Sequence, residues 1–96
     1  MMEKDHFKNR TESTTILKDN KIGDMVYICE KSMQPYAKEI SDLTYGEIVR
    51  ILTKKDHPRG IKVEIKTPTG QKAIGRIVYK TFNDKVIIKN IRRVYD

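Results

Sequence analysis

The clearest pattern in the chain is an alternation of hydrophobic and polar positions between residues 22 and 80. In IKVEIKT (61–67), the aliphatic residues Ile61, Val63 and Ile65 alternate with three charged ones. Successive side chains of a β-strand point to opposite faces. This segment is therefore predicted to be a strand with an aliphatic inner face and a charged outer face.

Four further segments show a similar but less regular alternation, and short polar segments rich in Gly, Pro, Asn and Asp follow three of the strands. The four predicted strands are IGDMVYICEK (22–31), YGEIVRILTK (45–54), KAIGRIVYK (72–80) and VIIKNIRRVYD (86–96), the last as one strand or two short ones. The predicted turns are DHPRG (56–60), PTGQ (68–71) and FNDK (82–85). About five short strands joined by tight turns predict an all-β fold, a small SH3-like barrel.

Two segments lack a sustained period of two. Residues 1–20 are polar and are predicted to be a flexible N-terminal tail, followed by a barrel domain at 21–96. The alternative for the tail is a short helix that docks through Phe7, Ile16 and Leu17. Residues 31–42 are predicted to form a long connecting loop with room for one helical turn.

The charge is unevenly distributed along the chain. Of 96 residues, 20 are Lys or Arg and 13 are Asp or Glu, giving a formal net charge of +7. Residues 1–48 hold seven basic and nine acidic residues, whereas residues 49–96 hold 13 basic and four acidic ones. Such asymmetry favours a basic face directed at a polyanion. The other interpretation is that the lysines only solubilise a small domain.

Sequence motifs of catalysis and metal binding are missing. The single cysteine, Cys29, lies in an apolar run and is predicted to be a reduced thiol in or near the core. His6, His57 and Cys29 are too scattered for a zinc site, and the five glycines are isolated. We therefore expect a protein that is not an enzyme and that uses no metal or other cofactor. No apolar run approaches the length of a signal peptide or membrane span, so a cytoplasmic protein without membrane contact is expected.

Basic side chains concentrate between residues 54 and 80. Lysines there would neutralise phosphates, arginines could form forked hydrogen bonds with phosphates or base edges, and His57 could stack or donate. Tyr45 and Tyr79 could supply stacking faces beside this row. The alternative is a solvated strand face with the tyrosines half in the core. The predicted nucleic-acid-binding residues are Lys54, Lys55, His57, Arg59, Lys62, Lys66, Arg76 and Lys80.

The segment LTYGEIVRILTKKDHPRGIKVEI, followed by GQKAIGRI, resembles the YwbE family of small bacterial proteins, a domain of unknown function. The resemblance covers residues 22–80 and rests on a Leu-Thr-x-Gly strand, a His-Pro-x-Gly-Ile-Lys-Val corner and a Gly-Gln…Gly-Arg-Ile strand. The matching residues are Leu43, Thr44, Gly46, His57, Pro58, Gly60, Ile61, Lys62, Val63, Gly70, Gln71, Gly75, Arg76 and Ile77. The loop 31–42 is longer than usual for the family, and KAI separates Gln71 from Gly75 more widely. The order of the strands is also similar to that of KOW and Tudor-like barrels, which bind RNA, ribosomal components or peptides. Both resemblances imply a small β-barrel with a non-enzymatic role.

The leading prediction is a module that binds nucleic acid, RNA rather than DNA, through a basic strand face and turn; a ribosome-associated role would fit it. The first alternative is a protein-interaction module, a small regulator or inhibitor that docks on an acidic partner. Its contacts would come from Met33, Pro35, Tyr36 and Ile40 in the long loop. The second alternative is an oligomer that sequesters a small anionic nucleotide. The sequence leaves the oligomeric state open.

Overall fold

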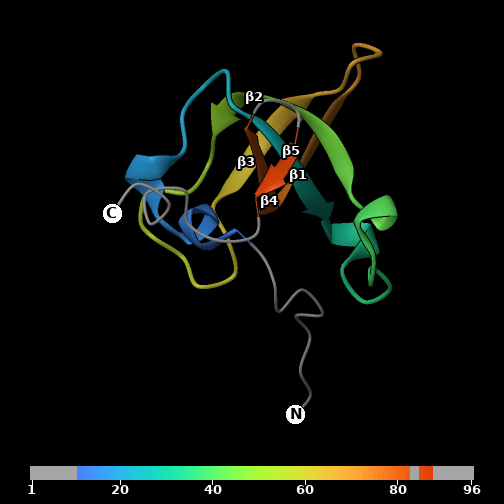
Figure 1. The fold of residues 1–96 in the computed structure, drawn as a ribbon, viewed down its shortest axis with the longest axis horizontal. Coiled ribbons are helices and arrows are strands. Elements are labelled where there is room, and N and C mark those ends of the chain that lie inside the picture. Colours follow the sequence, from blue (N-terminus) through green and yellow to red (C-terminus); the bar gives the residue numbers. More distant parts are fainter. Residues whose placement is uncertain (1–10, 83–84, 88–96) are drawn as a thin grey trace.

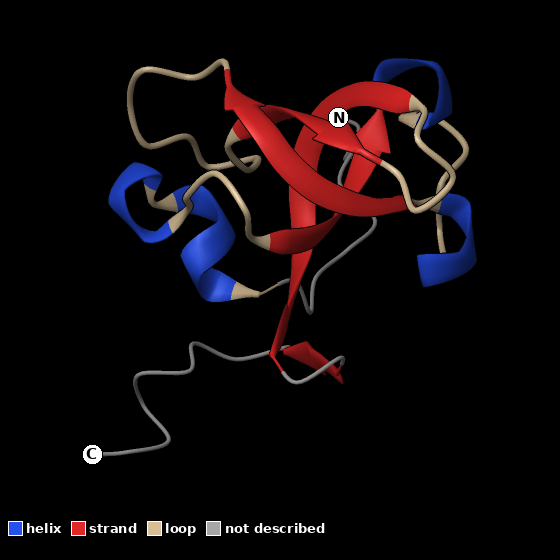
Figure 2. Cartoon of the chain, turned by 90° about the horizontal axis from the view of Figure 1, so that it is seen from above, coloured by secondary structure: helices blue, strands red, loops and turns tan. Residues whose placement is uncertain are grey.

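The computed structural model describes residues 11–82 and 85–87, and these form a small all-β barrel. Its strands are β1 (Met25–Glu30), β2 (Thr44–Ile51), β3 (Lys62–Lys66), β4 (Lys72–Phe82) and β5 (Lys85–Ile87). They follow one another in an antiparallel sheet in the order β1-β2-β3-β4-β5, and β1 also pairs with β4. That additional pairing closes four strands into a barrel, and β5 extends the end of β4 (Figures 1 and 2). The prediction of an SH3-like barrel of about five strands is confirmed.

The core lies inside the barrel and is aliphatic. Its fully buried members come from alternate positions of the strands, as the period of two predicts. They are Val26, Ile28, Ile48, Ile61, Val63, Ile65 and Ile77, each 0 % exposed. Burying one such side chain contributes roughly 1.5–3 kcal/mol, so this cluster is the main source of stability in a chain with few aromatic residues.

A second, smaller cluster lies outside the barrel, under the loop between β1 and β2. The register between β1 and β4 shifts between Tyr27 and Ile28, so that Val78 becomes an extra residue on β4. Val78 is 3 % exposed because the loop places Ala37 over it. Cys29 packs half-buried beside these two residues, which confirms a near-core position for the thiol.

The same loop contains two short 3₁₀ turns, η3 (Lys31–Met33) and η4 (Ile40–Asp42), where one helical turn was expected. Asp42 fixes the second turn, since its Oδ2 accepts the N–H groups of Lys38 at 2.9 Å and of Glu39 at 3.1 Å. These hydrogen bonds lower the pKa of the Asp42 carboxyl, because they favour its charged form. The loop is thus held by its own backbone contacts as well as by Ala37.

Residues 11–20 differ from the expected flexible tail, because they pack on the barrel as two 3₁₀ turns, η1 (Glu12–Thr15) and η2 (Leu17–Asp19). The Thr11 N–H donates to the Val78 carbonyl at 3.1 Å, and Leu17 packs against the core. Thr11, Thr14 and Asn20 are buried. Their polar side chains bond backbone atoms, as when Thr14 Oγ1 donates to the Thr11 carbonyl at 2.6 Å, so the segment is ordered without a hydrophobic period.

Parts of two predictions lie outside the described residues. The first is the N-terminal tail, since residues 1–10, with Phe7 of the alternative docking helix, are not described. The second is the predicted C-terminal strand, most of which lies beyond Ile87. Within the described ranges, no helical segment is long and apolar enough to cross a membrane.

Candidate nucleic-acid interface

A row of basic side chains lies on the outer face of the β3–β4 hairpin. Lys62 of β3 is paired with Arg76 of β4, and Lys66 is paired with Lys72. Side chains of directly paired residues lie on the same face of a sheet, so these four point outward together. The predicted shared face of Lys62, Lys66 and Arg76 is therefore present. We call the outward set Arg50, Lys62, Lys66, Lys72 and Arg76 the cationic face.

An ion pair neutralises the middle of the cationic face. The Nε of Arg50, on β2, lies 3.0 Å from Oε1 of Glu64, on β3. Lys62 and Lys66 stand on either side of Glu64, four residues apart, which corresponds to about 13 Å along a strand. The cationic face thus has two positively charged ends, Lys62 with Arg76 and Lys66 with Lys72, separated by a neutral centre.

Lys72 and Arg50 belong to this face but were not among the predicted site residues. The position of Lys72 on this face follows from the turn between β3 and β4. Gly70 takes a positive φ of 94°, and the Thr67 N–H donates to the Gln71 carbonyl at 2.7 Å, which closes a tight hairpin. A hairpin closed at residues 67 and 71 places residues 66 and 72 opposite each other. Placing Arg50 on this face requires knowing that β2 pairs with β3, and these two strands are separated by a longer loop than β3 and β4 are.

The loop between β2 and β3 carries the other predicted turn residues, and the N-terminal segment holds it in place. The His57 N–H donates to the Thr15 carbonyl at 3.0 Å, and Asp56 Oδ1 accepts the Leu17 N–H at 2.8 Å. Figure 1 shows this loop beside the two N-terminal 3₁₀ turns, at the opposite end of β3 from the β3–β4 hairpin tip. Lys54, Lys55 and Arg59 are exposed on it.

Hydrogen bonds join this loop to the cationic face at both ends of the loop. The Lys62 N–H donates to Thr53 Oγ1 at 2.7 Å, and Nη1 of Arg76 donates to the Gly60 carbonyl at 3.0 Å. The loop therefore adjoins the Lys62–Arg76 end of the cationic face. Of the eight predicted residues, Lys62, Lys66 and Arg76 belong to the cationic face, and Lys54, Lys55, His57 and Arg59 belong to the adjoining loop.

His57 is part of this surface as a neutral side chain. Its Nδ1 accepts the Arg59 N–H at 3.1 Å, which assigns the ring proton to Nε2. Burial lowers the pKa of His57, and the positive charges of Arg76 and Arg59 lower it further. At pH values above its usual titration range, the imidazole adds no positive charge to this surface. It can still stack or donate through Nε2, the two roles expected from the sequence.

The lowered pKa of His57 has a direction that NMR can test. The folded protein favours the neutral ring of His57. The neutral ring therefore contributes fully to the free energy of unfolding above pH 6.5, and this contribution is lost as the pH falls through the folded-state pKa. We expect the His57 Cε1–H resonance to titrate below pH 6.5 and the free energy of unfolding to decrease between pH 7.5 and 5.5. His57→Asn keeps a comparable acceptor and should reduce this decrease. A His57 resonance that titrates above pH 6.5 would contradict the prediction.

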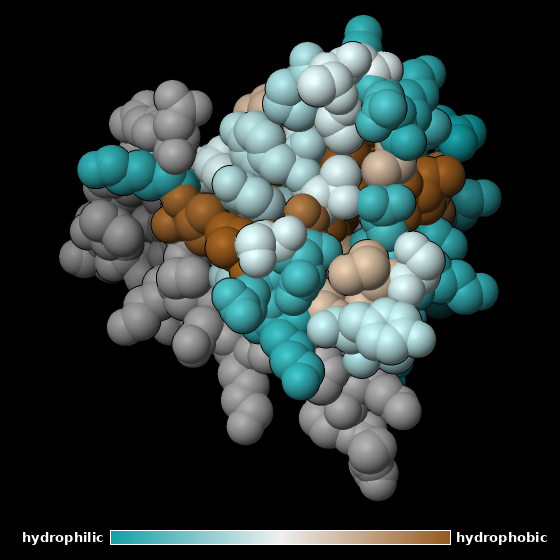
Figure 3. Space-filling view, turned by 90° about the vertical axis from the view of Figure 1, so that its right-hand side faces the viewer, coloured by the Kyte–Doolittle hydropathy of each residue, from teal (hydrophilic) through white to brown (hydrophobic). Residues whose placement is uncertain are grey.

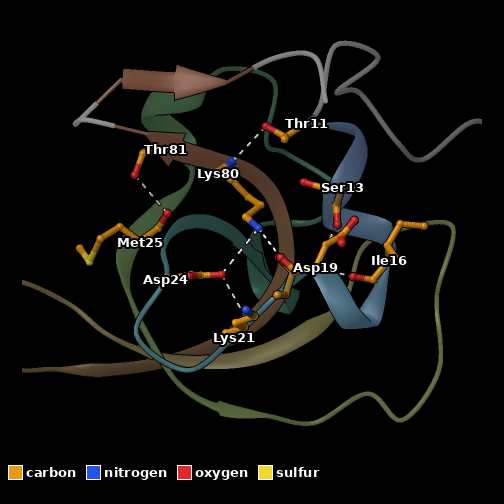
Figure 4. A network of polar contacts seen from close by, with 10 residues as sticks. Thr11, Ser13, Ile16, Asp19, Lys21, Asp24, Met25, Lys80 and Thr81 are labelled. Atoms are coloured by element: carbon orange, nitrogen blue, oxygen red, sulfur yellow. Dashed lines mark hydrogen bonds and ion pairs between the residues drawn. The ribbon is translucent and has the colours of Figure 1, made fainter. Parts of the chain in front are cut away.

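Lys80, the eighth predicted residue, lies away from the cationic face. Its side chain is 14 % exposed, and its Nζ lies 3.6 Å from Asp24 Oδ2 (Figure 4). The same ammonium donates to the Asp19 carbonyl at 2.5 Å, and the Lys80 N–H donates to Thr11 Oγ1 at 3.0 Å. The contacts of Lys80 therefore connect β4 to the N-terminal segment.

The predicted stacking residues also lie on another side of the barrel. Tyr27 and Tyr45 are paired across β1 and β2, with ring centroids 4.7 Å apart, and Tyr79 is paired with Tyr27 across β1 and β4. The three tyrosines span β2, β1 and β4, whereas the cationic face spans β2, β3 and β4. In the closed sheet, β1 and β3 occupy opposite sides, so the tyrosines do not form a row beside the lysines.

Comparisons with known proteins complete the description of the site. In the part of the chain that the structure describes, no three His, Cys, Asp or Glu residues gather to hold a metal ion. No curated protein and no solved structure matches the chain. One family model, described as "Uncharacterized conserved protein (DUF2196)", matches residues 13–79. This match agrees with the resemblance to the YwbE family and covers β1 to β3, most of β4 and most of the docked N-terminal turns.

Proposed function

The chain belongs to the family of uncharacterized conserved proteins DUF2196, and since this description supplies no activity, we propose from the surface chemistry that it is a non-enzymatic module that binds RNA. The observation that supports the proposal is the continuity of the cationic face with the β2–β3 loop. RNA is favoured over DNA by the likeness of the strand order to KOW barrels. A ribosomal RNA would be one such partner.

The arrangement of charges suits a phosphate backbone. The two ends of the cationic face are separated by about 13 Å along β3, roughly twice the distance between neighbouring phosphates of a nucleic-acid strand. A backbone that crosses the face would place phosphates at both ends and pass over the Arg50–Glu64 ion pair. Contacts of this kind position a nucleic acid without reading its sequence, so we propose binding of low sequence specificity.

Salt dependence tests the proposal directly. Each phosphate contact releases counterions, so log K for a single strand falls with log salt by about 0.7 per contact. With four contacts we expect a slope of about −3 for a fluorescein-labelled single-stranded RNA, measured by fluorescence anisotropy. A DNA strand of the same sequence should bind more weakly. If no RNA binding is detected at low salt, or if affinity does not change with salt, the proposal fails.

Docking of a protein through the β1–β2 loop is the second candidate function. The side chains of Tyr36 and Ile40 are 69 % and 40 % exposed although both are apolar in large part. Met33, by contrast, packs against the second cluster and supports the loop from beneath. Tyr36 and Ile40 are thus available for a partner, whereas Met33 holds them in place.

A further inference from the structure

One edge of β4 has no strand beside it. β4 pairs with β3 from Lys72 to Arg76, but its pairing with β1 extends only from Lys80 to Gly75. β1 ends at Glu30, and the chain turns away into η3 at Lys31. Among the described residues, no strand therefore lies next to Lys72–Ile74 on the side that β1 occupies further along.

The backbone of this edge points outward from the hairpin. Residues 67 and 71 form a hydrogen-bonded pair, and so do residues 61 and 77, whose N–H···O distance is 3.0 Å. Because such pairs alternate with non-hydrogen-bonded ones in an antiparallel ladder, Ala73 and Gly75 direct their backbone groups toward β3. Lys72 and Ile74 direct theirs to the opposite side, where a continuation of β1 would pair with them.

An open groove of about 370 Å³ runs along this edge. Glu30 and Lys31 form one wall, and Glu64, Lys72, Ala73 and Ile74 form the other. The Ile74 side chain is 40 % exposed although it is aliphatic. Figure 3 views the protein from the side of the β3–β4 hairpin and η3, and shows hydrophobic side chains exposed between hydrophilic ones.

The groove has a small excess of positive charge. Glu64 is paired with Arg50 at 3.0 Å, whereas Glu30 Oε2 accepts a hydrogen bond from the uncharged Thr44 Oγ1 at 2.6 Å, so the formal charges of Glu30, Lys31 and Lys72 sum to +1. Lys31 and Lys72 are exposed on opposite walls, and in the described ranges neither ammonium belongs to an ion pair. A segment lying between them would meet a positive charge on each side.

We propose that this groove binds an extended acidic segment of a partner protein, which adds to β4 as a strand in line with β1. Backbone hydrogen bonds to Lys72 and Ile74 would supply affinity, as in other cases of strand addition. An apolar residue of the segment covers Ile74, and carboxylates on the same face of the segment, two residues to either side of it, face Lys31 and Lys72. A second copy of this chain is disfavoured as occupant, because edge-to-edge pairing would bring two Lys72 ammoniums together. This site goes beyond RNA binding and does not depend on it.

The test uses a capped eight-residue peptide, Glu-Thr-Val-Thr-Glu-Thr-Val-Thr, which presents Val and Glu on the same face of a strand, titrated into the ¹⁵N-labelled chain. We expect amide shifts at Lys31, Lys72 and Ile74. A peptide with Lys in place of Glu should bind at least tenfold more weakly. N-methylation of the alternate amides that face β4 should abolish binding while keeping every side chain. Equal binding of the Glu and Lys peptides, or of the N-methylated peptide, overturns the proposal.

Paired variants separate this site from the RNA interface. Lys31→Glu should weaken peptide binding at least tenfold and leave RNA affinity within twofold, whereas Lys62→Thr should weaken RNA binding roughly fivefold at 50 mM salt and leave peptide affinity within twofold. Lys18→Glu, at an exposed position on η2, is the control with the same change of charge. If Lys18→Glu weakens the peptide as much as Lys31→Glu does, binding follows net charge and the groove is not the site. RNA should shift the Lys72 amide, because Lys72 also belongs to the cationic face. If single-stranded RNA shifts the Lys31 amide as well and displaces the peptide, the groove belongs to the RNA interface and the proposal is overturned.

Discussion

Replacing Gly75 with alanine is expected to cost about 3 kcal/mol of folding free energy or more, which for a domain of this size approaches its whole stability. Gly75 lies where β4 crosses β1, and a Cβ atom there would overlap the backbone carbonyl of Cys29. The obstacle is backbone, so no rotamer change relieves it, and the two strands must separate. The ladder that closes the barrel would then break. Urea denaturation, followed by circular dichroism, measures the loss.

Gly23→Ala is the matched control for this experiment. Gly23 has a φ of 101° but no atom within 4 Å of the position that a Cβ would take. Its replacement should cost only about 1 kcal/mol, the price of a left-handed backbone for a residue with a side chain. Gly46→Ala should resemble Gly75→Ala, because a Cβ at Gly46 would lie 2.5 Å from the Lys66 carbonyl oxygen. Equal losses for Gly75→Ala and Gly23→Ala would show that β1 and β4 do not approach this closely.

Removing three lysines of the cationic face is expected to reduce RNA affinity roughly 100-fold at 50 mM salt. The variant is Lys62→Thr, Lys66→Thr and Lys72→Thr, in which Thr retains a high preference for strands. These side chains are exposed, so the barrel should keep its stability. Because three phosphate contacts are lost, the slope of log K against log salt should become less steep by about 2. Fluorescence anisotropy with the same RNA strand measures both quantities.

The control removes three exposed lysines elsewhere: Lys18→Thr, Lys38→Thr and Lys85→Thr, with the same change of net charge. Its affinity should stay within a few-fold of the parent protein. Substitution of Tyr36 and Ile40 by Ser should leave RNA affinity unchanged. If the β1–β2 loop is instead the functional surface, the same substitutions should abolish binding of the partner protein. A 100-fold loss in the Lys18 control as well would mean that the attraction is diffuse and that the cationic face is not an interface.

The strands and their inner faces could be predicted from the sequence because alternation is local information. Ile61, Val63 and Ile65 are buried as expected, and Val26 and Ile28 share a face as expected. One exception is Val78, which alternation assigns to the outer face with Arg76. The bulge opposite Tyr27 and the overlying Ala37 bury it, and both depend on contacts between distant segments.

The site was predictable where it depends on one hairpin and unpredictable where it depends on closure of the barrel. Lys62, Lys66 and Arg76 belong to adjacent strands, and their common face follows from period and turn. Lys80 has the same spacing on β4, yet its ammonium contacts Asp24 and the Asp19 carbonyl. Asp24 lies in the turn before β1, and Asp19 lies in the N-terminal segment, whose docking was predicted only as an alternative to a flexible tail. Leu17 does pack against the core, as that alternative predicts, but in a 3₁₀ turn.

The docking of residues 11–20 on β4 also imposes an order on biosynthesis. Thr11 reaches its partners Val78 and Lys80 only after almost the whole barrel has been translated. At about 5–20 residues per second, the ribosome needs roughly 3–12 s to pass from residue 20 to residue 80. During that interval Thr11, Thr14 and Leu17 remain without the surface that covers them, and β1 lacks the strand that closes the barrel against it. Although this segment emerges before every strand of the barrel, its final contacts form only once β4 is available, so a nascent chain stalled before β4 should be far more sensitive to protease than the released protein.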